Sequence, residues 1–153
     1  MSDTGFSGPY VTAAFLCEKL LIEAGSVPSF IRVVDRFTLP KFSEELPPGF
    51  PVPTINATLV VLLRSADIGQ GKHTVTIRLQ KPDFTYLPEQ KHPVFFQGGD
   101  DNGAMLHLPI GLAMPDEGLF WFDVVFDDVS LLTRIPMRVL HQPAMFQQVG
   151  GGR

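Results

Sequence analysis

Residues 115–140, PDEGLFWFDVVFDDVSLLTRIPMRVL, decide the fold class. Apolar residues alternate along both halves of this segment, at Phe120, Phe122, Val124 and Phe126 and then at Ile135, Met137 and Val139. A short acidic turn, Asp127-Asp128, separates the two halves. Because successive side chains of a strand point to opposite faces, this period of two predicts two strands joined in a hairpin. We expect the hairpin to close an antiparallel β-sandwich.

Further strand-like runs precede this hairpin. They cover residues 30–39, 55–64, 73–80, 93–97 and 106–112, and turn residues separate them. Many short strands at such spacing are typical of an all-β sandwich. With residues 11–23 and the hairpin, about eight strands result. We predict a single domain over residues 10–142, a flexible N-terminus over 1–9 and a flexible glycine-rich tail over 143–153.

The conformation of residues 11–23 is open between strand and helix. Their apolar positions fit helical spacing, whereas Leu20, Leu21 and Ile22 are consecutive and interrupt a strict alternation. However, residues 25–28, GSVP, form a turn, and a β-rich run follows at once. A hairpin uses both runs, so we favour the strand.

Asp35 is the polar exception in the second run. It falls in a row with the apolar residues Ile31, Val33, Phe37 and Leu39. A carboxylate in a core row is costly unless it is paired or hydrogen-bonded. We expect a bulge or twist that turns Asp35 outward, or a pairing with an arginine such as Arg36 or Arg134. A buried acid at a functional site is the alternative.

Residues 40–53, PKFSEELPPGFPVP, are rich in proline. Proline fixes φ and lacks an N–H donor, so this segment is no central strand. We expect a crossover between the sheets that Phe42, Leu46 and Phe50 pack down. A partner-binding arm is the alternative.

Composition excludes several classes of protein. The formal net charge of −4 provides no electrostatic footprint for nucleic acid or for an anionic membrane. Cys17 is the only cysteine, so no intrachain disulfide forms. The first ten residues lack a basic region, and Glu18 and Lys19 cut the apolar run that follows. We therefore expect no signal peptide, no membrane span and a cytoplasmic location.

Residues that could carry catalysis are scattered. The histidines His73, His92, His107 and His141 never stand two or four positions apart, so we expect surface or edge histidines and no zinc site. Cys17 lies in an apolar run without a motif, which favours a small buried hydrophobe over a nucleophile. No nucleophile elbow, phosphate loop or H-E-x-x-H motif occurs. We predict a non-enzymatic protein without a cofactor.

The strongest candidate for metal binding is the loop with Asp100, Asp101 and Asn102. Asp127 and Asp128 form a second acidic pair. Calcium needs about six to eight oxygen ligands, which loops at one end of a sandwich can supply together. Acidic turns are also common without metal, because Asp and Asn tolerate turn geometry.

Trp121 alternates with the inward phenylalanines and therefore belongs to the outward face, together with Leu119 and Val125. An apolar row on an outward face is either covered by a loop, such as the proline-rich segment, or is an interface. We treat Trp121, Leu119 and Val125 as interface candidates for a protein partner or a second copy.

The final residues, GGGR over 150–153, suggest a third hypothesis. Ubiquitin-like modifiers end in a flexible diglycine, but their fold contains a helix that these strand patterns do not predict. We expect a linker-like or disordered tail.

Two resemblances accompany these patterns. The segment Asp116-x-Gly118-x-Phe120-x-Phe122 resembles the D-x-G-x-Y-x-C segment of immunoglobulin-like domains, with phenylalanines in place of the tyrosine and the cysteine. FLCEKLLIEAG, FIRVVDRFTLP, TLVVLLRS, HTVTIRL, EGLFWFDVVFDD and LLTRIPMRVL together resemble an uncharacterised family of small bacterial domains.

The resemblances imply an immunoglobulin-like β-sandwich, in the cytoplasm and without known catalytic residues. We accordingly expect a binding or assembly module. The alternatives are a calcium-dependent binder or enzyme using the Asp100 loop, and a modifier-like protein using its terminal glycines.

Overall fold

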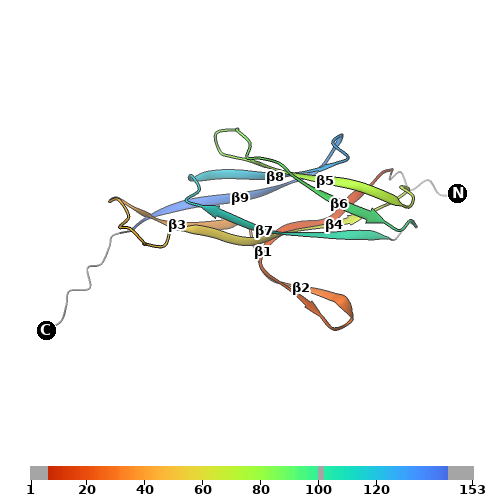
Figure 1. The fold of residues 1–153 in the computed structure, drawn as a ribbon, viewed down its shortest axis with the longest axis horizontal. Coiled ribbons are helices and arrows are strands. Elements are labelled where there is room, and N and C mark those ends of the chain that lie inside the picture. Colours follow the sequence, from red (N-terminus) through yellow and green to blue (C-terminus); the bar gives the residue numbers. More distant parts are fainter. Residues whose placement is uncertain (1–6, 100–101, 145–153) are drawn as a thin grey trace.

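Two β-sheets packed face to face make up the computed structural model, which describes residues 7–99 and 102–144 (Figure 1). The described residues form nine strands and one short 3₁₀ turn, Ala24–Ser26. The predicted all-β sandwich is confirmed. Within the described residues, no helix is long and apolar enough to cross a membrane.

The first sheet has four strands in the order β2-β1-β4-β7, and all of its pairings are antiparallel. Its strands are β1 (Tyr10–Glu23), β2 (Val27–Val34), β4 (Thr54–Arg64) and β7 (Gly103–Ala113). The predicted strand over residues 11–23 is therefore confirmed, and the helical alternative is wrong. Strand β4 lies centrally, which explains its continuous apolar run.

The second sheet has five strands in the order β3-β9-β8-β5-β6. Its strands are β3 (Arg36–Phe42), β5 (Gly71–Gln80), β6 (Gln90–Phe96), β8 (Gly118–Phe126) and β9 (Ser130–Ala144). Strand β3 runs parallel to β9, so the sandwich is not purely antiparallel. This pairing extends β9 to Ala144, two residues beyond the expected end of the domain.

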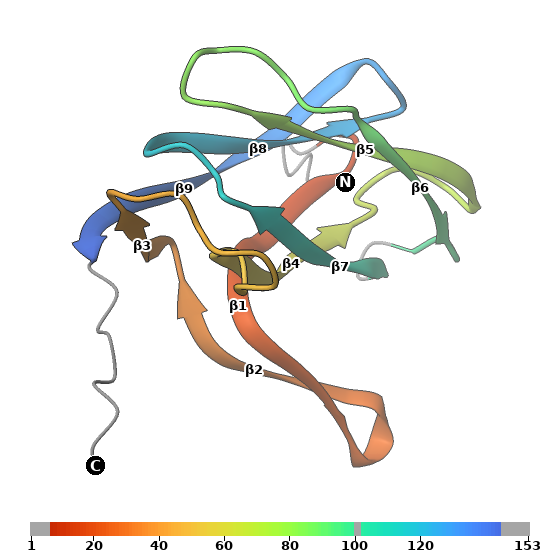
Figure 2. The ribbon, with the colours of Figure 1, turned by 60° about the vertical axis from the view of Figure 1, so that its left-hand side comes forward.

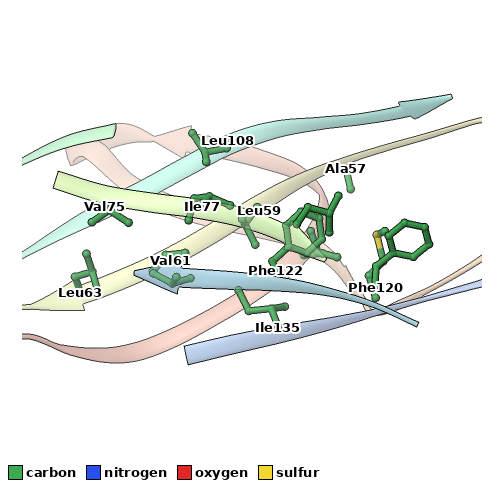
Figure 3. Close-up of a cluster of buried hydrophobic side chains, with 14 of the residues drawn as sticks. Ala57, Leu59, Val61, Leu63, Val75, Ile77, Leu108, Phe120, Phe122 and Ile135 are labelled. Atoms are coloured by element: carbon green, nitrogen blue, oxygen red, sulfur yellow. The ribbon is translucent and has the colours of Figure 1, made fainter. Parts of the chain in front are cut away.

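The hairpin of β8 and β9 supplies much of the core, as its alternation predicts. Phe120, Phe122 and Val124 face the opposite sheet and are at most 3% exposed. Figure 3 shows Phe120 and Phe122 in one cluster with side chains of the four-stranded sheet. The labelled members from that sheet are Ala57, Leu59, Val61, Leu63 and Leu108. Packing in this cluster holds the side chains of Phe120 and Phe122.

The hairpin of β1 and β2 projects away from the sandwich (Figure 2). Its tip turns at Gly25 and Ser26, both with positive φ. The apolar side chains that it exposes are Leu21, Ile22, Val27, Ile31 and Val33. Their exposed fractions run from 37% for Leu21 to 60% for Val33. The predicted core row through Ile31 and Val33 is therefore wrong.

The reason is a bend at Asp35, where the chain passes from β2 in one sheet to β3 in the other. Asp35 is exposed, as the hypothesis of an outward twist predicts. Its carbonyl accepts a hydrogen bond from the N–H of Arg138, which fixes the start of the parallel β3–β9 pair. Phe37 and Leu39, beyond the bend, pack against the core as expected.

The proline-rich segment is the predicted crossover, because it links β3 in the second sheet to β4 in the first. Its first residues, including Pro40, belong to the edge strand β3, where a missing N–H is tolerated. Phe42, Leu46 and Phe50 are half-buried, and the rings of Phe42 and Phe50 pack edge to face with centroids 5.4 Å apart.

Candidate binding surface on the five-stranded sheet

Trp121 lies on the outward face of the five-stranded sheet, as its place in the alternation predicts. It is half-buried, and so is Leu119 two residues before it. Val125, the third interface candidate, is only 7% exposed and is largely withdrawn from solvent. The outward row therefore offers Leu119 and Trp121 to a partner but not Val125.

Arg134 covers part of the Trp121 ring. Its guanidinium carbon lies 4.8 Å from the ring centroid, a cation–π distance. The same guanidinium donates from Nε to Asp123 Oδ1 at 2.6 Å and from Nη2 to Gln80 Oε1 at 2.7 Å. Arg134 on β9 is in register with Asp123 on β8, so the sheet itself places this pair. The three contacts hold Arg134 flat against the sheet.

The β5–β6 loop completes the surroundings of Asp123. Tyr86 from this loop forms a bridge with Gln80 and donates its hydroxyl to Asp123 Oδ2 at 3.5 Å. Arg78 lies over the Tyr86 ring, with its guanidinium carbon 5.7 Å from the centroid. Asp123 is consequently only 3% exposed, although it belongs to the outward face. The loop of residues 81–89 therefore covers Asp123 in this outward row.

Two further arginines lie on the same outward face as Trp121. Arg36 on β3 and Arg138 on β9 are directly in register in parallel strands, and both are exposed. Leu119 on β8 is in register with Arg138 on its other side. Neither arginine forms an ion pair with any residue in the described parts of the chain. We call Arg36, Leu119, Trp121, Arg134 and Arg138 together the Trp121 face.

The acidic turn at Asp127 and Asp128 lies at one end of the sandwich. The turn follows β8, whose last residue, Phe126, pairs with Val75 near the start of β5, and strand β6 also ends beside the start of β5. Asp100 and Asp101 lie outside the described residues. Asn102 is described, and its side-chain amide donates to the carbonyl of Gly98.

The oxygens of the acidic turn already have protein partners. Asp127 Oδ2 lies 2.7 Å from His73 Nδ1, and its Oδ1 accepts from the N–H of Thr74 at 2.9 Å. Asp128 accepts from Thr76 Oγ1 at 3.2 Å and from Lys91 Nζ at 3.1 Å. This turn is thereby tied to β5 and β6.

These contacts change the acidity of Asp127. Desolvation raises the pKa of its carboxyl, but the hydrogen bond from Thr74 and the hydrogen bond and charge of His73 outweigh it. The pKa of Asp127 therefore lies below its ordinary value. His73 also stacks on Phe126 with ring centroids 4.9 Å apart, which fixes the imidazole.

Other candidate residues form no reactive cluster in the described ranges. No three His, Cys, Asp or Glu side chains there converge as metal ligands. Cys17 is fully buried, as expected, and burial raises the pKa of its thiol. A raised pKa keeps the thiol protonated and a poor nucleophile.

Sequence reasoning missed the juxtaposition of Arg36 and Arg138, because only strand pairing brings β3 beside β9. It also missed the exposed hairpin, although the consecutive Leu20, Leu21 and Ile22 carry a pattern that indicates it. A strand cannot bury three successive side chains against one core, since they point to alternate faces.

Comparisons with known proteins find likeness only in solved structures, since no protein family and no curated protein matches the chain. A β-glucosidase from Listeria innocua in complex with glucose is similar at a TM-score of 0.47 and 12% identity, over 92% of this chain and 18% of that one. A β-D-glucoside glucohydrolase from Trichoderma reesei gives 0.46 and 11%, over 88% and 19%. The alkylpurine DNA glycosylase AlkC from Pseudomonas fluorescens, bound to DNA containing an abasic site analog, gives 0.39 and 10%, over 83% and 30%.

This chain thus spans less than a third of the length of each of these structures. Similarities this distant carry no information about activity or ligand. The resemblance to an uncharacterised bacterial family stays a prediction.

Proposed function

We propose that this chain is a non-enzymatic protein-binding module whose Trp121 face docks onto an acidic segment of a partner. The observation that carries the proposal is the register of Arg36 and Arg138. Like charges directly opposite each other on neighbouring strands are destabilising, and an anion between them relieves the repulsion. Carboxylates of a partner supply that anion, and arginine binds them in a bidentate geometry.

The neighbours of the arginine pair support the same proposal. Trp and Arg are enriched at the energetic centres of protein interfaces. Trp121 offers its uncovered ring surface and Leu119 an apolar contact next to Arg138. Asp123 and Gln80 already hold the Arg134 side chain, so a partner can contact its guanidinium without a further loss of side-chain freedom.

The test uses the chain as an immobilised bait in an extract of its native host. Arg36→Ser/Arg138→Ser is compared with Lys19→Ser/Lys41→Ser, which removes the same charge elsewhere. We expect the double arginine variant and Trp121→Ser to lose a bound protein that the lysine control retains. The captured protein must then bind the purified chain through an acidic segment, with affinity that falls as salt rises. Equal capture by all variants would refute the proposal.

A second candidate function is self-assembly through the β1–β2 hairpin, favoured by its exposed apolar side chains. Strand β2 is an edge strand, and contiguous exposed apolar surface is typical of interaction sites. Sedimentation velocity over a concentration series, measured for the wild type and for Ile22→Ser/Val33→Ser, tests this candidate function. We expect the wild type to associate and the variant to remain monomeric. Association that Trp121→Ser abolishes instead would assign self-association to the Trp121 face.

The strand order also supports an immunoglobulin-like topology within this proposal. Strands β5, β8 and β9 are neighbours in one sheet, as are strands C, F and G of an immunoglobulin domain, while β4 and β7 occupy the other sheet. A cytoplasmic location belongs to the same proposal. Binding modules of this architecture use loops and faces of a rigid sandwich for recognition.

A further inference from the structure

A groove lies at the end of the sandwich opposite the acidic turn. The proline-rich crossover forms one wall, and the turn between β7 and β8 forms the other, next to the ends of β3 and β9. Its volume is about 710 Å³, within the range of roughly 300–1,000 Å³ that is typical of small-molecule sites. The Trp121 face is not part of this groove.

The floor of the groove is apolar and aromatic. The half-buried Leu39, Phe42, Leu46 and Phe50 line it, and the opposite wall adds the exposed apolar side chain of Met114. The Phe42 and Phe50 rings pack edge to face against each other, which fixes the aromatic part of this surface. A ligand therefore needs an apolar body to exploit this floor.

Hydrogen bonds fix both walls. In the crossover, the N–H of Phe50 donates to Pro47 O at 3.1 Å, and the N–H of Met114 in the β7–β8 turn donates to Pro53 O at 2.8 Å, which joins the two walls. In the opposite wall, His141 Nε2 lies 2.8 Å from Pro115 O. The groove is therefore preformed to a large extent, which lowers the entropic cost of binding.

The rim of the groove is negatively charged. Three exposed carboxylates line it, from Glu44, Glu45 and Asp116, against a single cation, Lys41. None of the three carboxylates forms an ion pair with another described residue. Charge complementarity thus selects a cationic head over an anionic one.

We propose that this groove binds a small organic amine, with an aromatic or aliphatic body on the Phe42–Phe50 floor and an ammonium group at the carboxylate rim. An ammonium also gains from nearby aromatic faces, which an anion does not. The proposal is independent of protein binding at the Trp121 face, because the two sites share no residue.

Isothermal titration calorimetry with three matched probes tests the head group. The probes are 2-(1-naphthyl)ethylamine, 2-(1-naphthyl)ethanol and 1-naphthylacetate, which share the aromatic body and differ in charge. We expect the amine to bind at least tenfold more tightly than the alcohol, and the acetate not to bind. Equal affinities for amine and acetate, or no heat with the amine at millimolar concentration, would overturn the proposal.

Variants test the location. Glu44→Gln/Glu45→Gln/Asp116→Asn should weaken amine binding at least tenfold and leave alcohol binding within twofold. The control Glu18→Gln/Glu23→Gln/Glu89→Gln changes the net charge equally, away from the groove, and should bind like the wild type. Circular dichroism confirms that each variant is folded. Unchanged amine affinity in the rim variant would place the amine elsewhere and overturn the proposal.

Discussion

Replacing Phe122 by alanine tests the packing of the central hairpin. Phe122 is 1% exposed and lies in register between Leu79 on β5 and Ile135 on β9. Truncation of a buried phenylalanine costs about 3–5 kcal/mol. The ring also borders a pocket of about 310 Å³ between the sheets, so truncation enlarges an existing space instead of opening a closed one. We therefore expect a loss of about 3 kcal/mol, near the lower limit of that range.

Urea unfolding followed by circular dichroism measures this loss as a shift in the transition midpoint at constant slope. Thermal unfolding should show a decrease in Tm of roughly 6–12 °C, because about 1 kcal/mol corresponds to roughly 2–4 °C in a chain of this size. Phe122→Leu, which keeps much of the volume, should cost about 1 kcal/mol.

Trp121→Ala is the matched control, because its side chain leaves the same strand on the opposite face. This substitution removes the stacking of Arg134 and a ring that is half-buried. We expect it to lower the free energy of unfolding by about 1–2 kcal/mol. A loss below about 1 kcal/mol for Phe122→Ala, or a greater loss for Trp121→Ala, lies outside the expected range. Either result would refute the assignment of the inward face.

Three further substitutions address the Arg134–Asp123 pair, the first residue of β8 and the acidic turn. Arg134→Met should lower the free energy of unfolding by about 1–3 kcal/mol, because it leaves the buried Asp123 carboxylate without its charged partner. In a double-mutant cycle measured by urea unfolding, strict additivity of Arg134→Met and Asp123→Asn would argue against an interaction between the two side chains. Gly118→Ala should lower the free energy of unfolding by about 1–3 kcal/mol in the same assay. The reason is that Gly118 has φ +141° and a Cβ there would lie 2.7 Å from carbons of Pro82. An unfolding midpoint equal to that of the wild type would contradict this expectation. The pKa of Asp127 is lower in the folded chain than its ordinary value of about 3.9, so its ionised carboxylate stabilises the fold above that pH. This stabilisation is lost as the pH falls through the pKa of the folded state. Asp127→Asn should therefore flatten the decline in stability between about pH 5 and 2, and parallel curves for variant and wild type would disprove this.

Local patterns predicted much of the fold. The alternation of residues 115–140 gave the correct inward and outward faces of β8, including Trp121, because a strand's side-chain period does not depend on its partners. The run containing Asp35 shows where this fails. A bend divides it between two sheets, so the same alternation continues across residues that face different surroundings.

The candidate sites were less predictable than the strands. Trp121 and Leu119 were found from alternation alone, whereas the withdrawal of Val125 and the burial of Asp123 depend on neighbouring segments. Tyr86 reaches Asp123 only because the β5–β6 loop folds back over the sheet, and no local pattern in that loop indicates this. Contacts between distant segments carry no periodic pattern in the sequence.

The sequence by itself determined an all-β sandwich, its closing hairpin and a chain without a recognisable catalytic motif, because these follow from period, composition and motif spacing. Only the tertiary structure decided which strands are neighbours. The parallel β3–β9 pairing brings Arg36 beside Arg138, and the crossover brings Glu44 opposite Asp116 across a groove. Binding surfaces consist of such juxtapositions, and chain folding, not local preference, creates them.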